Sequence, residues 1–318
     1  MNCRIAKLLV FLLGWWSAGP ALAQQQPPPV KDDPLAALQS WMQENLDDSV
    51  LQALQQVDQE RVRQFFTLLQ QRFADTNIYE LGSIKEAADR ALPVLLQFEE
   101  TRPYGEWLQT HLDYLEAARE MQQEMKSIPP VKPGLPPAPL LRPTPQVQKK
   151  VWTRTLSARP MPPLAQRYVP QLKQIFVEEK LPPELVWVAE VESAFNPGAR
   201  SPVGAAGMFQ LMPATAKSLN LSSWPSDERL EPDKNARAAA KYLRQLHGHY
   251  HDWPLALAAY NAGEGRVDNL LRKQKAHSFD GIASRLPAET QMYVPKIDAT
   301  MRKREGHGLA ELIMPAAR

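Results

Sequence analysis

The amino-acid sequence predicts an all-α protein, and three observations indicate this fold class. Apolar residues recur at spacings of three and four along most of the 318 residues, which is typical of amphipathic helices. No segment has a convincing strand pattern, and no internal repeat is visible. A proline-rich stretch, residues 127–147, divides the helical pattern, so we expect two helical domains joined by a linker.

The first 23 residues have the features of a secretory signal peptide. Arg4 and Lys7 give a positive start, residues 8–16 form an apolar run, and Ala21-Leu22-Ala23 is a typical cleavage site. The run is too short to span a bilayer comfortably, although an uncleaved anchor is the alternative. We therefore expect an exported protein with no integral membrane segment after signal removal. Cys3 is the only cysteine, which leaves the mature chain without disulfides or thiolate metal sites.

Residues 24–126 are predicted to form a small, separate helical domain of unknown role. His111 lies on an apolar stripe, where a packed core histidine is commoner than a ligand. We find no catalytic constellation in this segment, and an envelope protein partner is one role open to it. Its four stripes are Leu35, Leu38, Trp41 and Met42; Val62, Phe65, Phe66 and Leu69; Ala91, Leu92, Leu95 and Leu96; and Trp107, His111, Tyr114 and Leu115.

The proline-rich stretch, residues 127–147, contains eight prolines. This composition excludes a helix or a central strand, because proline lacks the N–H that both structures use. We interpret the stretch as a semi-rigid linker. A ligand for an SH3-type domain is the alternative, but such domains are not expected outside most bacterial cells.

The two parts of the chain carry opposite charge, although the whole chain has a formal net charge of only +2. Residues 24–126 contain 9 Lys and Arg against 18 Asp and Glu, whereas residues 127–318 contain 26 against 17. A basic C-terminal part in an exported protein favours an anionic extracellular partner, with ordinary surface charge as the alternative. A nucleic-acid partner is not expected, because no arginine and aromatic motif of that kind is visible.

Residues 148–318 form the second predicted domain, and residues 181–197 are its most informative stretch. Pro183 suits the first turn of a helix, and Asn196-Pro197 ends it, because a residue before proline avoids the α region. The helix has one apolar face that ends in a carboxylate. The residues on that face are Leu185, Val188, Ala189 and Glu192.

Glu192 has the position expected of a general acid. Partial burial at the end of an apolar face raises a carboxyl pKa, and the negative end of the helix dipole acts in the same direction. Glu190 cannot be its partner from the same helix, because two residues differ by about 200° around the axis. On this helix alone, a glutamate that reaches solvent is the commoner outcome.

Further helices are predicted in this domain from apolar spacing and from helix boundary residues. Asp252 is a plausible N-cap for the helix that starts at Trp253, and Asn261-Ala262-Gly263 ends that helix. The predicted helices span residues 168–179, 213–219, 233–247, 253–260, 265–271 and 287–301.

Three more segments have an unusual composition. Residues 201–213 are rich in glycine and alanine, which let a ligand approach the backbone, and they include the amide of Gln210. The second segment places Tyr260 and Asn261 at a helix end, and the third places Tyr293 near the C-terminus. Each segment taken alone is more simply a glycine turn, a helix cap or a core tyrosine.

Taken together, four pieces of residues 168–296 resemble, in order, the four motifs of the lytic transglycosylase catalytic domain, which has a goose-lysozyme-like fold. The match covers somewhat under half of the chain and is specific, because four spaced motifs rarely recur together by chance. Residues 181–185 and 293–296 are most similar to the membrane-bound D subgroup. The four pieces are Val191 to Pro197, Gly207 to Gln210, Ala259 to Gly263 and Glu289 to Val294.

The resemblance implies cleavage of the β-1,4 bond between N-acetylmuramic acid and N-acetylglucosamine in peptidoglycan glycan strands. The products would be 1,6-anhydromuramoyl ends, formed without water and without a metal or other cofactor. Glu192 would be the single catalytic group, first as acid and then as base. Hydrogen bonding to the substrate or support of Glu192 is implied for Ser193, sugar binding for Gln210 and Asn261, apolar walls for Met208, Phe209 and Tyr260, and a hydrogen bond near Glu192 for Tyr293.

Two other functions stay open. A hydrolytic muramidase or chitinase would need a second carboxylate to position water, and the candidates are Asp227, Glu228 and Glu264, none of them compelling from spacing. A non-catalytic glycan-binding envelope module is the second alternative. Glu192 argues against it, because a binding module does not need a half-buried acid.

Overall fold

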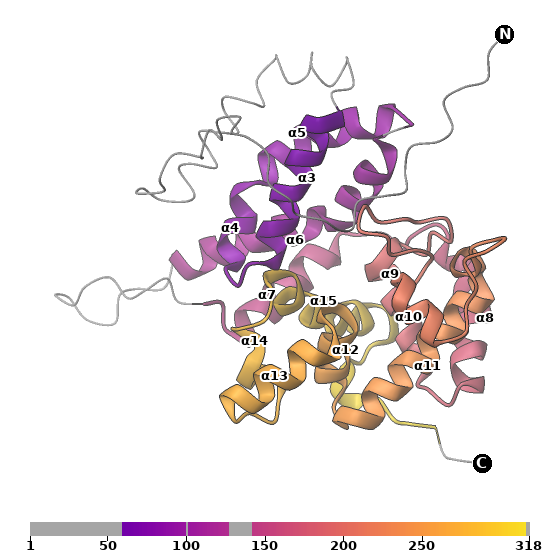
Figure 1. Cartoon of the computed structure of the whole chain (residues 1–318). Coiled ribbons are helices and arrows are strands. Elements are labelled where there is room, and N and C mark those ends of the chain that lie inside the picture. Colours follow the sequence, from indigo (N-terminus) through magenta and orange to yellow (C-terminus); the bar gives the residue numbers. More distant parts are fainter. Residues whose placement is uncertain (1–58, 100, 127–141, 316–318) are drawn as a thin grey trace, which may run out of the picture.

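The computed structural model describes residues 59–99, 101–126 and 142–315, and within these ranges it is all-α, as predicted (Figure 1). No strand occurs in the described residues, which contain only two isolated bridges, both made by Ala206. The predicted signal peptide, the stripe at residues 35–42 and most of the linker lie outside the described ranges. No helix within them is long and apolar enough to cross a membrane.

Within the described residues of the N-terminal part, residues 59–99 and 101–126, there are four helices. Helix α4 starts after Asn77, whose side chain accepts a hydrogen bond from the backbone N–H of Tyr79 and so caps the helix. Pro93 lies inside α5. The long helix α6 packs along both α4 and α5. The bounds are α3 Gln59–Ala74, α4 Ile78–Ser83, α5 Lys85–Gln97 and α6 Arg102–Lys126.

The C-terminal part contains nine α-helices and three 3-10 helices in the described residues. Helices α7 and α14 were not predicted, and α7 begins at Pro145, inside the stretch assigned to the linker. Thr144 caps α7 by accepting from the N–H of Val147. The bounds are α7 Pro145–Ser157, α8 Ala165–Glu178, η1 Pro183–Trp187, α9 Val188–Ser193, α10 Pro213–Ser218, η2 Glu228–Leu230, α11 Pro232–Tyr250, α12 Trp253–Ala262, α13 Glu264–Gln274, α14 Phe279–Ala283, α15 Ala288–Glu305 and η3 Leu309–Glu311.

The predicted helix over residues 181–197 is divided in two and is shorter than expected. Its first turn is the 3-10 helix η1, and the α-helix α9 ends at Ser193 rather than at Asn196. Ala194 and Phe195 both have positive φ, at 51° and 63°, and their N–H groups bond back to Glu190 and Ala189. A left-handed turn therefore ends the helix, and it leaves Glu192 in the last turn.

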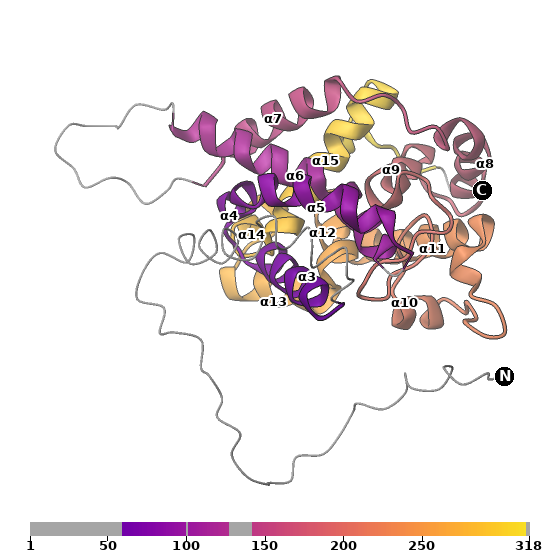
Figure 2. The ribbon, with the colours of Figure 1, turned by 90° about the horizontal axis from the view of Figure 1, so that it is seen from above.

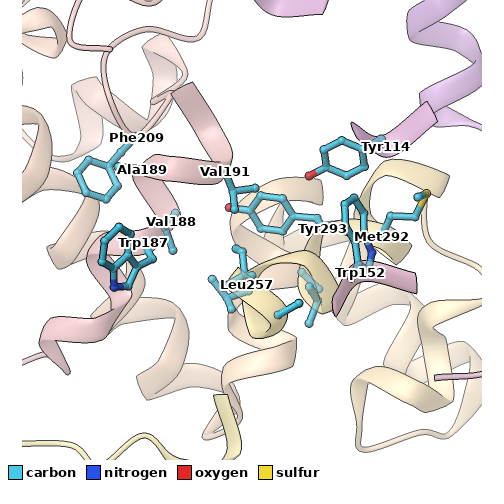
Figure 3. Close-up of a cluster of buried hydrophobic side chains, with 14 of the residues drawn as sticks. Tyr114, Trp152, Trp187, Val188, Ala189, Val191, Phe209, Leu257, Met292 and Tyr293 are labelled. Carbon is cyan, nitrogen blue, oxygen red and sulfur yellow. The ribbon is translucent and has the colours of Figure 1, made fainter. Parts of the chain in front are cut away.

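Helix α15 lies at the centre of the packing. It contacts α3 and α4 of the N-terminal part and η1, α7, α9 and α12 of the C-terminal part. Seen from above, the N-terminal helices lie across the C-terminal ones (Figure 2). The buried apolar residues of both parts form one continuous cluster, in which Tyr114 of α6 lies near Trp152 and Tyr293 (Figure 3).

Candidate active site

The carboxyl group of Glu192 meets the phenol of Tyr293 across the contact between α9 and α15. The Tyr293 hydroxyl donates a hydrogen bond of 2.6 Å to Oε1 of Glu192. Burial raises the pKa of Glu192 to about 8, and the nearby charge of Glu289 acts in the same direction. The hydrogen bond from Tyr293 and the charge of Lys296 lower it to a smaller degree. Glu192 therefore holds a proton at neutral pH and can act as a general acid.

A second carboxylate, Glu289, lies near Glu192 and has the opposite ionisation. Burial opposes its charge, but His111, Asn261 and Lys296 outweigh burial and lower the pKa of Glu289. Asn261 Nδ2 donates to Oε1 of Glu289 at 3.2 Å, and His111 Nε2 lies 3.7 Å from the same oxygen. The surroundings thus raise the pKa of Glu192 and lower the pKa of Glu289.

Gln210 lies on a loop whose conformation is fixed by buried polar side chains. Arg229 Nη1 donates to the carbonyls of Gly204 and Leu211, and Asn235 Oδ1 accepts from the N–H of Phe209. Gln210 has φ of 46°, and its Nε2 donates to the carbonyl of Gly207 at 2.7 Å. The turn at residues 227–232 therefore positions the loop through Arg229.

Gly207 is required on this loop by space as well as by backbone conformation. Its φ is 82°, and a Cβ added to it would lie 1.9 Å from the carbonyl oxygen of Arg229. The close approach of the two backbones brings the loop against η2. This close approach explains why glycine stands at position 207 of the second motif.

Four of the predicted substrate-binding residues are engaged with the protein itself. Ser193 is buried and its hydroxyl donates to the carbonyl of Met208 at 2.8 Å, which ties α9 to the loop. Met208 and Phe209 are fully buried behind the cavity walls. The Tyr260 hydroxyl donates to the carbonyl of Phe209 at 2.6 Å. Of the two roles considered for Ser193, this geometry favours support of Glu192's surroundings.

Two cavities meet at Glu192. The larger has a volume of about 750 Å³ and the smaller about 380 Å³, and Glu192, Gln210 and Trp107 line both. Tyr260 and Asn261 line the smaller cavity together with Glu289. The arrangement is a cleft on either side of one protonated carboxyl, with amide groups along its walls.

The carboxylates suggested for a hydrolytic mechanism do not line either cavity. Asp227 pairs with Arg229 at 2.9 Å, and Glu228 pairs with Lys234 at 2.7 Å. Glu264 begins α13. Among the described residues no group of histidine, cysteine, aspartate and glutamate side chains could hold a metal ion.

The N-terminal part brings groups to this site that local sequence patterns did not predict. His111 contacts Glu289, and Asp113 forms an ion pair of 2.9 Å with Lys296, both side chains being about 5% exposed or less. One feature of the sequence indicates a special role for Asp113, because this residue lies next to an apolar stripe of α6. That feature did not indicate a partner 183 residues away.

Comparison with known proteins gives the class of the C-terminal part. The family model described as the transglycosylase SLT domain matches residues 176–282, which include three of the four motifs. Residues 176–282 are therefore similar to the transglycosylase SLT domain. The prediction of this family from the four motifs is confirmed.

Among the individual relatives, the membrane-bound lytic murein transglycosylase D of Escherichia coli strain K12 is 39% identical over 124 residues. The match is 38% of this chain and 27% of the relative. The soluble lytic murein transglycosylase of Salmonella typhimurium is 37% identical over 119 residues, which are 35% of this chain and 18% of the relative. The chain thus spans about a quarter or less of the length of these relatives.

A lytic transglycosylase Slt of Pseudomonas aeruginosa, known from an X-ray structure, is similar at a TM-score of 0.40 with 22% identity. That match covers 80% of this chain and 45% of the other chain.

Proposed function

We propose that this protein is a peptidoglycan lytic transglycosylase with Glu192 as its single acid and base. The observation that carries the proposal is the carboxyl of Glu192, hydrogen-bonded by Tyr293, at the junction of two cavities, where burial raises its pKa. The transglycosylase SLT domain and the relatives named murein transglycosylases support the same activity and substrate.

The reaction uses Glu192 twice. Glu192 first donates its proton to the glycosidic oxygen, and the bond to the muramoyl anomeric carbon breaks. The N-acetyl group of the substrate stabilises the positive charge at that carbon, as in substrate-assisted glycosidases. The ionised Glu192 then takes the proton of the muramoyl 6-hydroxyl, whose oxygen attacks the anomeric carbon and closes the 1,6-anhydro ring. A pKa of about 8 suits both steps near neutral pH.

Tyr293 and the loop amide have supporting roles in this proposal. The phenol of Tyr293 stays protonated, because burial and Glu192 raise its pKa well above the usual value, so it donates to the carboxylate after the first proton transfer. Gln210, which lines both cavities, binds N-acetyl or hydroxyl groups of the glycan. Asn261 orients Glu289 and lies at the wall of the smaller cavity.

A hydrolytic muramidase is the second candidate, and Glu289 is the observation that favours it. Glu289 is an ionised carboxylate that lines the same cavity as Glu192, and such a pair can position water. Its contacts with Asn261 and His111 point instead to a fixed structural charge. The products separate the two candidates, because hydrolysis adds one water to each cleaved bond.

We further propose that the protein acts in the periplasm or cell envelope after removal of residues 1–23. The features of that segment and the location of peptidoglycan support this assignment. An envelope protein partner of residues 24–126 remains a prediction.

The test of the proposed function is digestion of purified sacculi by the wild-type protein and by the Glu192→Gln variant. We expect anhydromuramoyl ends from the wild type and none from the variant, with unchanged circular dichroism. Anhydro ends released by the variant at the wild-type rate would contradict the role of Glu192.

A further inference from the structure

Helix α6 of the N-terminal part forms one wall of the cleft at Glu192. Trp107 lines both cavities, and Thr110 and Asp113 of the same helix line the larger one. Phe73 of α3 and His111 of α6 line the smaller one. Residues that the sequence assigns to a separate domain therefore face the candidate acid from across the cleft.

This wall is fixed to the rest of the protein by buried polar contacts. Lys296 of α15 donates to Asp113 at 2.9 Å, and its ammonium group lies 4.1 Å from the ring centre of Tyr114. At the other side, Gln291 Nε2 donates to the carbonyl of Thr76 at 2.8 Å. The face of α6 that borders the cleft is therefore held at a fixed position relative to Glu192.

Trp107 is held as a rigid aromatic surface at this wall. Its ring stacks on His111 with centroids 4.0 Å apart and planes inclined by 21°. The rings of Phe66 and Phe73 meet it at 5.7 and 5.6 Å in edge-on arrangements. The indole is half-buried, so part of it remains open to the two cavities.

A fixed, half-buried indole beside a cleft is suited to saccharide binding. The C–H face of a sugar ring packs on an aromatic face, and little conformational entropy is lost when the aromatic is already held. Because Trp107 borders both cavities at the position of Glu192, a glycan that runs through the cleft must pass it. Polar groups of Gln210 lie at the same junction for hydrogen bonds to the sugar.

We infer that Trp107 is a saccharide-binding residue and that the N-terminal helices complete the glycan cleft of this protein. This inference rests on the proposed function, since the ligand is the peptidoglycan glycan strand. It assigns residues 59–126 a role in substrate binding, in addition to any protein partner. His111 is a positioning residue in the same wall, because it stacks on Trp107 and contacts Glu289.

The test is calorimetric binding of a tetrasaccharide prepared from peptidoglycan to full-length protein that carries Glu192→Gln. Adding Trp107→Leu should weaken binding roughly tenfold, because the apolar bulk stays but the aromatic face is lost. Trp107→Phe should weaken binding by a smaller factor, roughly threefold, because its aromatic face is smaller. Trp224→Ala is the matched control, since Trp224 is 83% exposed and lines neither cavity.

Unchanged affinity in the folded Trp107→Leu protein would overturn the inference. Trp107→Leu is not used if it lowers the thermal midpoint by more than a few degrees. The test is then the turnover kinetics of Trp107→Phe in otherwise wild-type protein. We then expect Trp107→Phe to raise KM with little change in kcat, and an unaltered KM overturns the inference. Failure of the proposed function gives a different result. In that case the Glu192→Gln variant with its native Trp107 would release anhydro products.

Discussion

The hydroxyl of Tyr293 donates a hydrogen bond of 2.6 Å to Glu192, across 101 residues of sequence. The two residues lie on α9 and α15, which pack against each other in the core. This contact lowers the pKa of Glu192 against the stronger effect of burial, which raises it. The carboxyl is thus protonated at neutral pH yet has a donor ready for its ionised form.

Replacement of Tyr293 by phenylalanine should move the pH dependence of activity. The hydrogen bond favours the ionised carboxyl, so its loss should raise the pKa of Glu192 and shift the alkaline fall in rate to higher pH. The rate at the optimum should drop, since the donor no longer stabilises the carboxylate. The pH–rate profile of the variant measures both effects. Tyr250→Phe is the control, because Tyr250 bonds to Asp268 and lines neither cavity.

Protein stability should also depend on Glu192 and pH. The folded-state pKa of about 8 lies above the ordinary glutamate value of 4.5, so the folded protein binds this proton more tightly than the unfolded chain. Wild type should therefore lose stability relative to Glu192→Gln as pH rises from about 4.5 to about 8, with no further change above. The expected difference between pH 5 and pH 9 is on the order of 4 kcal/mol, at about 1.4 kcal/mol for each pKa unit. Thermal unfolding of both proteins at pH 5 and pH 9 tests this, and an equal difference at both pH values would contradict it.

The buried pair of Asp113 and Lys296 should be essential for the packing of α6 on α15. Asp113→Leu leaves the ammonium of Lys296 buried without its carboxylate and should cost about 3–5 kcal/mol. The double variant with Lys296→Met should recover much of this loss, because no unpaired charge remains. Urea unfolding measures the values. Asp89→Ala removes the exposed pair with Lys85 and should change stability by less than about 0.5 kcal/mol.

Two glycines with similar φ angles should respond differently to alanine. Gly207 has φ of 82° and a Cβ there would overlap the carbonyl of Arg229, whereas Gly263 has φ of 88° and open space around it. Gly263→Ala should cost about 1 kcal/mol from backbone strain alone. Gly207→Ala should cost more than about 2 kcal/mol and reduce turnover, since Gln210 moves with the loop. Equal losses of stability would contradict the role of the close approach.

The sequence predicted the fold class and Glu192 because both depend on local patterns. Helical spacing is visible within about 15 residues, and the apolar face that ends in Glu192 lies on one short segment. The end of α9 was placed wrongly, because the left-handed turn at Ala194 and Phe195 uses residues with no special preference for it. Helix α7 was missed because its first residues share the proline-rich composition before it.

Contacts between distant segments could not be predicted from one sequence. His111 was interpreted as a core residue, and the structure places it between Trp107 and Glu289, half-buried at the cleft. The pairing of Asp113 with Lys296 depends on how α6 crosses α15, which local patterns do not specify. The proline-rich stretch predicts two separate domains, and no local pattern indicates that the two parts share one core.

The most direct test of the central claim is mass spectrometry of the fragments that wild-type protein releases from purified sacculi. We predict fragments with 1,6-anhydromuramoyl ends, each one water lighter than a hydrolysis product, and no such fragments from Glu192→Gln. Fragments with reducing ends that incorporate oxygen from labelled water would contradict the claim and would assign hydrolysis to Glu192 and Glu289.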